Sequence, residues 1–133
     1  RVVYASLDGI WEDGQQTSAP QPDAFGAAAA ALAHPKAGAV VVSMSPDELC
    51  REGLPSDRCD AVLLLRQDAA GARRLPELWP LLLPHVRNLN AMPGLAAADV
   101  PPPAHLRQHG LSLQQPANPD LAWQQVRRLF LAR

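Results

Sequence analysis

The residues of this chain best suited to chemistry are charged and follow one another between two apolar runs. Arg51–Leu54 reads Arg-Glu-Gly-Leu and Asp57–Asp60 reads Asp-Arg-Cys-Asp, while the flanking runs are Gly38–Val42 and Ala61–Leu65. If both runs are strands of an open α/β sheet, their carboxyl ends face the ligand. The arginines of this segment could bind a small anion or a nucleotide there, or form a structural charge network with the neighbouring carboxylates.

Four oxygen-bearing side chains follow the first apolar run. Asp47 and Glu48 could supply ligands to a metal ion, but acids in the first turn of a helix more often interact with the helix dipole. Ser43 and Ser45 could be nucleophiles, but neither a glycine-rich elbow nor a neighbouring histidine accompanies them. We therefore expect structural roles for all four.

The histidines and cysteines give weak signals. His105 and His109 are four residues apart, the spacing of two metal ligands on one helix face, but no third ligand is obvious and we expect no metal site. His34 and His85 flank prolines and are expected in loops. Cys59 lies between Arg58 and Asp60, which could lower its pKa, although such cysteines usually serve packing.

Length and composition limit the classes of function that the chain can have. The 133 residues predict one domain, 1–133, with a net charge of -1 that offers no basic surface for nucleic acid. We expect Cys50 and Cys59 to be reduced, buried side chains in a cytoplasmic protein. No apolar run approaches the roughly 18 residues that span a membrane, and no signal peptide is visible. Because Arg1 is followed at once by a strand-like segment, we expect a piece of a longer protein.

Elements that would position these residues are clearest in the first half. Val2–Leu7, Gly38–Val42 and Asp60–Leu65 are expected to be buried strands, the last of them central in a parallel sheet. Ile10–Glu12 and the turn Asp13-Gly14 predict a small hairpin, followed by a loop over 15–22. Asp23 is expected to cap a helix over 24–33, and Ser45-Pro46-Asp47-Glu48 to begin a short helix that ends at Gly53.

The second half is rich in proline and expected to be irregular over about 75–110. Leu75–Leu83 is expected to be helical only in part, and Pro101–Pro103 to be an extended spacer. Short strands are predicted at 86–90 and 111–114. An amphipathic helix is predicted over about 120–132, with Leu121, Val126, Leu129 and Phe130 in one stripe and Trp123 directed to the core rather than to an interface.

Alternating strands and helices at this spacing predict an α/β fold with a three-layer, Rossmann-like, mostly parallel sheet. Three blocks then resemble the Mur ligases of the cyanophycin-synthetase type. Arg1–Gly14 resembles the strand and turn that follow the phosphate loop, His34–Ala61 resembles the next block, and Val86–Pro93 resembles a later strand that ends in Asn-Ala-Asp-Asp. Together they cover about two-thirds of the chain in the same order.

The resemblance implies a truncated central domain of a ligase that binds ATP and magnesium, forms an acyl phosphate and lets an amine attack it. The positions it assigns to nucleotide or anion binding are Asp8, Gly9, Arg51, Arg58 and Asn90. The chain departs from the family where ligands are needed. Ser43 stands at the metal-ligand position, Pro46-Asp47-Glu48 replaces an arginine–glycine–glycine stretch, and Met92-Pro93 replaces paired aspartates. The glycine-rich phosphate loop would precede Arg1.

Three interpretations remain at this stage. The first is a non-catalytic domain with a structural, scaffolding or dimerising role, without a cofactor, whose partners are other domains of the same polypeptide or another copy, and neither nucleic acid nor membrane. The second is the nucleotide-binding core of a functioning ATP-dependent amino-acid ligase. The third is a module that binds a small anion or a partner peptide at the strand ends.

Overall fold

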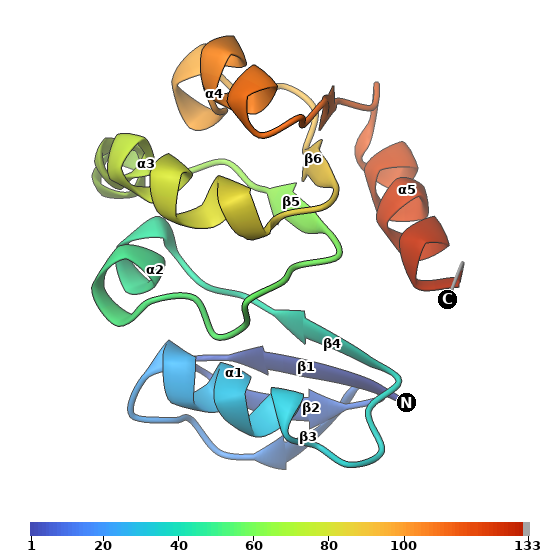
Figure 1. Ribbon diagram of the computed structural model, residues 1–133. Helices are drawn as coiled ribbons and strands as arrows, with labels where there is room; N and C mark the ends of the chain where they lie inside the picture. Colours follow the sequence, from blue (N-terminus) through green and yellow to red (C-terminus); the bar gives the residue numbers. More distant parts are fainter. Residues whose placement is uncertain (132–133) are drawn as a thin grey trace. The chain divides into compact units, whose positions relative to one another are not determined.

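The computed structural model describes residues 1–131, except for the side chains at 122, 126 and 129–131. The described residues form a mixed α/β structure with two compact units (Figure 1). Arg1–Pro55 makes up the first unit, and the residues from Ser56 onward make up the second. Within these residues, no helix is both long enough and apolar enough to cross a membrane.

The first unit is a four-stranded sheet with two helices. Its strand order is β3-β2-β1-β4, with antiparallel pairing along β1, β2 and β3 and parallel pairing between β1 and β4. The elements are β1 (Val2–Ser6), β2 (Gly9–Glu12), β3 (Gln15–Ser18), α1 (Ala24–Leu32), β4 (Ala39–Val42) and α2 (Pro46–Glu52). The predicted hairpin is confirmed, because Asp13 and Gly14 form the turn with φ of 49° and 85°.

One face of this sheet is the core of the unit. Val3 and Ala5 of β1 are fully buried and pack with Ile10 against Ala27 and Ala31 of α1. The neighbouring side chains of β1 point to the other face and stay exposed. The predicted strand over 2–7 is therefore confirmed as β1, but only one of its faces is buried.

The loop predicted over 15–22 was wrong in its first half, where β3 lies. Gln15–Ser18 is polar, and three of its four residues are exposed, so it lacks the apolar alternation that marks a strand. It forms because the tight turn at Asp13-Gly14 directs the chain back along β2, where backbone pairing at the sheet edge does not require apolar side chains.

The helix ends of the first unit agree with the sequence. Asp23 caps α1 by accepting a hydrogen bond from the backbone N–H of Gly26. In α2, the N–H of Glu48 donates to Ser45 Oγ at 3.1 Å, and the N–H of Ser45 donates to Glu48 Oε1 at 2.9 Å. This reciprocal capping box starts the helix, and Gly53, with φ of 94°, ends it.

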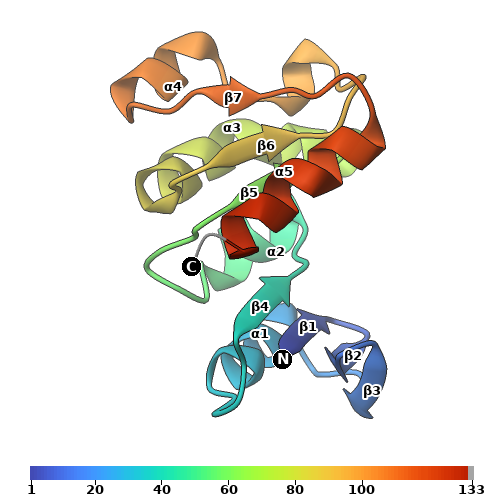
Figure 2. The ribbon, with the colours of Figure 1, turned by 90° about the vertical axis from the view of Figure 1, so that its right-hand side faces the viewer.

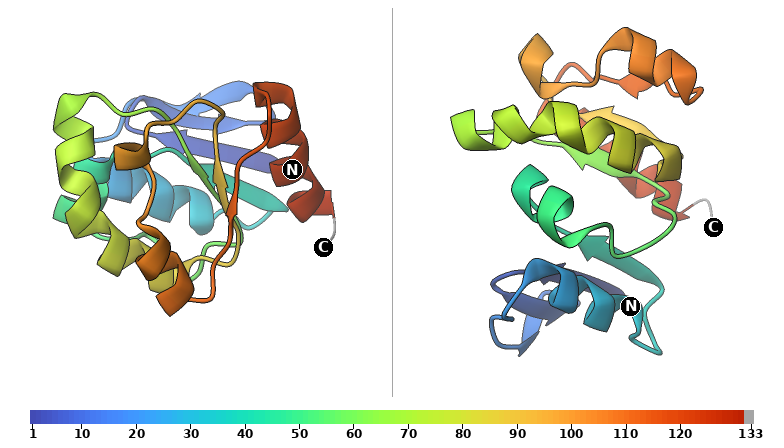
Figure 3. Two further views of the ribbon diagram at one scale, coloured as in Figure 1. Left: turned by 90° about the horizontal axis from the view of Figure 1, so that it is seen from above. Right: turned by 60° about the vertical axis from the view of Figure 1, so that its left-hand side comes forward.

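The second unit is built on a parallel sheet of three strands in the order β5-β6-β7. Its helices α3 and α5 lie on opposite faces of this sheet (Figures 2 and 3). The elements are β5 (Val62–Leu64), α3 (Ala69–Leu82), the 3-10 turns Leu83–His85 and Ala97–Asp99, β6 (Leu89–Ala91), α4 (Pro103–Gln108), β7 (Leu113–Gln114) and α5 (Pro119–Leu131). The strand predicted as central, 60–65, is shorter and lies at an edge of this sheet, where its partner is β6. The α/β class is therefore confirmed, but the strands belong to two sheets, of which the first is mainly antiparallel, instead of one mostly parallel sheet.

Helix α3 corrects the prediction of a largely irregular segment. It runs unbroken over 14 residues although Pro76 and Pro80 lie inside it. Asp68 caps it by accepting a hydrogen bond from the N–H of Gly71 at 2.7 Å, and one face buries four large side chains: Leu75, Leu78, Trp79 and Leu82. Both prolines are exposed, so the backbone carbonyls that lose their helical partners can meet water. Burial of the apolar face outweighs their cost.

Two other expectations in the second half need correction. Pro103 is the first residue of α4, so the proline spacer ends at Pro102. The C-terminal helix is confirmed as α5, but Trp123 is 56% exposed and does not enter the core. Leu121 is also exposed, and the other members of the predicted apolar stripe have side chains outside the described residues.

Candidate functional site

The parallel strands β1 and β4 bring several predicted site residues to one sheet edge. The backbone N–H of Ser43 donates to the carbonyl of Ala5 at 2.9 Å, so the carboxyl ends of the two strands lie side by side. Asp8 and Gly9 follow β1 at this edge, while Ser45 and α2 follow β4. Ligands of open α/β sheets bind at such an edge, so its polar groups decide what the first unit can bind.

The turn after β1 is shaped by contacts within the hairpin. Gly9 has φ of +142°, and a Cβ there would lie 2.5 Å from the carbonyl oxygen of Ser18 and 2.7 Å from Gln16 Nε2. The N–H of Asp8 donates to Ser6 Oγ at 3.1 Å, and its carbonyl accepts from Gln16 Nε2 at 3.4 Å. Glycine is therefore required here by the close approach of β3.

The polar side chains after β4 are engaged in shaping and extending α2. Ser45 and Glu48 form the capping box, and Asp47 Oδ2 lies 3.3 Å from Nη1 of Arg51, one helical turn later. Both members of this ion pair are more than half exposed, so the pair contributes only about 0.3–0.5 kcal/mol. The expected structural roles of Asp47 and Glu48 at the helix start agree with these contacts.

Arg58 and Asn90 belong to the second unit. Arg58 Nε lies 3.6 Å from Asp60 Oδ1, in an exposed pair. Asn90, in the middle strand of its sheet, is only 2% exposed, and its Nδ2 donates to the carbonyl of Val62 at 3.4 Å. Asn88 makes a similar bond to the carbonyl of Asp60 at 2.8 Å. These amides reinforce the pairing of β5 and β6.

Cys59 is a packing residue rather than a reactive thiol. Burial raises the pKa of the Cys59 thiol, so the suggested lowering by the neighbouring arginine was wrong. Its backbone N–H donates to the carbonyl of His85 at 2.7 Å, and its carbonyl accepts from Arg87 at 3.0 Å. Cys50 and Cys59 form no disulfide, as expected, but each is half-buried rather than fully buried.

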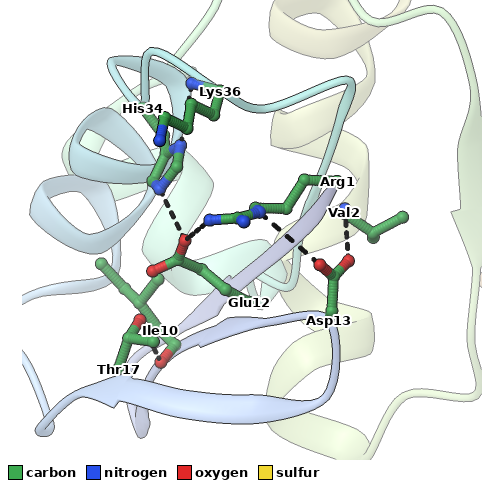
Figure 4. Close-up of polar contacts among 8 residues, drawn as sticks. All are labelled: Arg1, Val2, Ile10, Glu12, Asp13, Thr17, His34 and Lys36. Carbon is green, nitrogen blue, oxygen red and sulfur yellow. Dashed lines mark hydrogen bonds and ion pairs between the residues drawn. The ribbon is translucent and has the colours of Figure 1, made fainter.

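A charged cluster in the first unit was not predicted from the sequence (Figure 4). His34 Nε2 lies 2.7 Å from Glu12 Oε1, which also lies 3.3 Å from Nη1 of Arg1. Arg1 Nε lies 3.6 Å from Asp13 Oδ2, while Asp13 Oδ1 accepts the backbone N–H of Val2 at 2.9 Å. The cluster joins the end of α1 to the β1–β2 pair. Its members are distant in sequence, so no local sequence pattern predicts their contact.

Glu12 is held in its charged form by this cluster. Desolvation, the largest single contribution, acts to raise the pKa of Glu12, but side-chain hydrogen bonds with Thr17 and His34 act to lower it. A further hydrogen bond from Arg1 acts in the same direction, so the pKa of Glu12 lies below its ordinary value.

A histidine beside a carboxylate can serve as a catalytic base when its second ring nitrogen is free to take a proton. The Nδ1 atom of His34 instead accepts the backbone N–H of Lys36 at 3.2 Å, which places the ring proton on Nε2, toward Glu12. Both ring nitrogens are therefore used to hold the loop after α1 against β2. The geometry supports a structural role for the pair.

No protein-family model matches the chain, and no curated protein is significantly similar to it.

Proposed function

We propose that this chain is a non-catalytic Mur-ligase-like domain with a scaffolding role in a protein that resembles cyanophycin synthetase. The observation that carries the proposal is that the polar side chains after β4 make their contacts within the start of α2 and along this helix. Ser45 and Glu48 cap α2, and Asp47 pairs with Arg51 at 3.3 Å. An active relative would need oxygen ligands for magnesium at this edge.

ATP-dependent ligation requires magnesium ligands that these polar groups are poorly placed to supply. Magnesium is usually held by one or two carboxylates together with phosphate oxygens, and Ser43 offers only a hydroxyl at the position assigned to a carboxylate by resemblance. Moving Glu48 to a metal would break the capping box, which is worth about 1 kcal/mol. The edge is therefore better suited to holding α2 than to holding a nucleotide.

A scaffolding role is supported by exposed apolar side chains on the sheet of the first unit. On the face opposite α1, Val2 is 49% exposed and Tyr4 is 37% exposed. The ring of Tyr4 lies 5.5 Å from that of Trp11, its partner across the strands. Aromatic residues are enriched in protein interfaces, so the pair of Tyr4 and Trp11 makes this face a candidate contact surface. We propose that another domain of the polypeptide, in the cytoplasm, or a second copy covers this face.

Sedimentation over a range of concentrations tests the version with a second copy. We expect reversible dimerisation that is weakened by Tyr4→Thr, which removes the ring but keeps a residue suited to a strand. Leu32→Thr, at an exposed position of α1, is the matched control and should leave the dimer intact. Dimerisation that both variants reduce equally would contradict a specific role for the Tyr4 face.

A further inference from the structure

A hollow between α3 and α4 brings two histidines together. Its volume is about 160 Å³, and its lining consists of Trp79, Pro80, Leu83, His105, Gln108 and His109. The N–H of His109 donates to the carbonyl of His105 at 3.3 Å, so the two residues are one helical turn apart. His105 belongs to α4 and His109 is the residue that directly follows this helix, and both line the same hollow.

Within the part of the chain that the structure describes, the two imidazoles differ from the other two histidines in their lack of a hydrogen-bond partner. His34 engages both ring nitrogens, and His85 Nδ1 lies 2.8 Å from the carbonyl oxygen of Asp57. Among the residues that the structure describes, neither His105 nor His109 has a side-chain hydrogen bond or an ion pair, although both are half-buried. Their ring nitrogens are not among the buried atoms that lack a partner, so both imidazoles are accessible to a ligand that needs two nitrogen donors.

We propose that His105 and His109 bind a divalent transition-metal ion, with Cu²⁺ as the best fit. Two imidazoles separated by three residues have the spacing of a metal-binding pair, and here the last turn of α4 brings both to one hollow. The amide oxygen of Gln108 and water can complete a four-coordinate nitrogen and oxygen set, which suits Cu²⁺ and Ni²⁺. The described residues contain no group of three or more His, Cys, Asp or Glu side chains placed to hold a metal, which favours these ions over a structural zinc site.

The size and lining of the hollow fit such an ion. A water molecule occupies about 30 Å³, so the hollow holds an ion with a few waters rather than an extended organic ligand. Leu83 is 1% exposed and Trp79 is 2% exposed, so the floor beneath the histidines is apolar. Copper bound there lies next to the Trp79 indole, whose fluorescence gives a direct signal because Cu²⁺ quenches nearby fluorophores.

Titration of the 133-residue chain with Cu²⁺ at neutral pH tests the site. We expect saturable quenching of tryptophan fluorescence at one ion per chain, and an electron paramagnetic resonance spectrum with nitrogen ligands. His105→Gln and His109→Gln should each weaken binding by roughly tenfold or more, since even residues that only support a metal ligand have effects of that size. Trp79→Phe should reduce the quenching and leave the resonance spectrum unchanged.

Arg107→Ala is the matched control, because Arg107 lies on the same helix but does not line the hollow. It should bind copper as the wild type does. Circular dichroism of every variant confirms that the helices are intact. The proposal is overturned if the double variant His105→Gln/His109→Gln keeps wild-type affinity or its resonance spectrum, or if no saturable binding occurs in the folded wild type.

Discussion

The imidazole of His34 and the carboxylate of Glu12 meet at 2.7 Å, joining the loop after α1 to strand β2. The pair lies near the amino ends of β1 and β4, since Arg1 and Asp13, beside the start of β1, complete the cluster. Asp8 and Gly9, which the Mur-ligase resemblance assigns to nucleotide binding, lie at the other end of β1. The best-formed charged cluster of the first unit therefore stabilises the fold at a distance from the expected ligand edge.

The Glu12 cluster predicts a specific dependence of stability on pH. Because the folded-state pKa of Glu12 is below its ordinary value, its contribution is present above the unfolded pKa, about 4.3, and is lost as the pH falls through the folded value. Glu12→Gln should lower the urea midpoint at neutral pH and show a smaller further loss on acidification. Thr17→Val removes the hydroxyl that donates to the carbonyl of Ile10 and also helps to lower the pKa of Glu12, so its pH profile should fall between those of the wild type and Glu12→Gln. Parallel pH profiles for the three proteins would show that Glu12 is not held charged by these contacts.

The two serines after β4 should behave differently. Ser45→Ala removes the capping side chain of α2 and should cost about 1 kcal/mol of unfolding free energy. Ser43→Ala keeps the backbone bond to Ala5 and should change stability by less than about 0.5 kcal/mol. Urea unfolding of both variants makes the comparison, and a larger loss in Ser43→Ala would assign its hydroxyl a role that the backbone contact does not explain.

Replacing a proline inside helix α3 should stabilise the protein. Pro76→Ala restores the N–H that can bond to the carbonyl of Ala72, and alanine is preferred inside a helix by about 3 kcal/mol. The unfolded chain gains about 1 kcal/mol of conformational freedom, so a net stabilisation of roughly 2 kcal/mol is expected. Pro20→Ala, in the loop before α1, has only the second effect and should destabilise slightly. Thermal or urea unfolding distinguishes the two, and equal destabilisation would contradict a continuous α3.

Local signals in the sequence predicted the features that depend on neighbouring residues. Asp23, the Ser45–Glu48 capping box, the Asp13-Gly14 turn and the stop at Gly53 each act within four residues, and all are observed. Asp23 and Ser45 could be identified because a helix start requires a side-chain acceptor whatever the rest of the fold does.

Features decided by distant contacts were missed. Glu12 and His34 are far apart in sequence, and neither lies in a pattern that indicates its partner. The two prolines in α3 predicted an interrupted helix. The burial of the apolar face, which outweighs their cost, depends on tertiary packing and is not visible in the sequence. Trp123 was assigned to the core rather than to an interface, but its exposure depends on what packs against α5, which an amphipathic pattern does not specify.

The family resemblance stays a prediction, and the residues that carry it also define its test. Asp8, Gly9, Ser43 and Arg51 belong to the first unit, while Arg58 and Asn90 belong to the second. Asn90 is buried in its sheet, and the two arginines pair with Asp47 and Asp60. A nucleotide would have to compete with these contacts.

Calorimetric titration of the folded chain with ATP and magnesium tests the central claim most directly. If the polar groups after β4 serve α2 and the domain is non-catalytic, no heat of binding is expected while circular dichroism confirms the fold. Saturable binding that Arg51→Gln or Arg58→Gln abolishes, with Arg127→Gln as the exposed control on α5, would contradict that claim. It would favour instead a nucleotide-binding core that retains part of a ligase site.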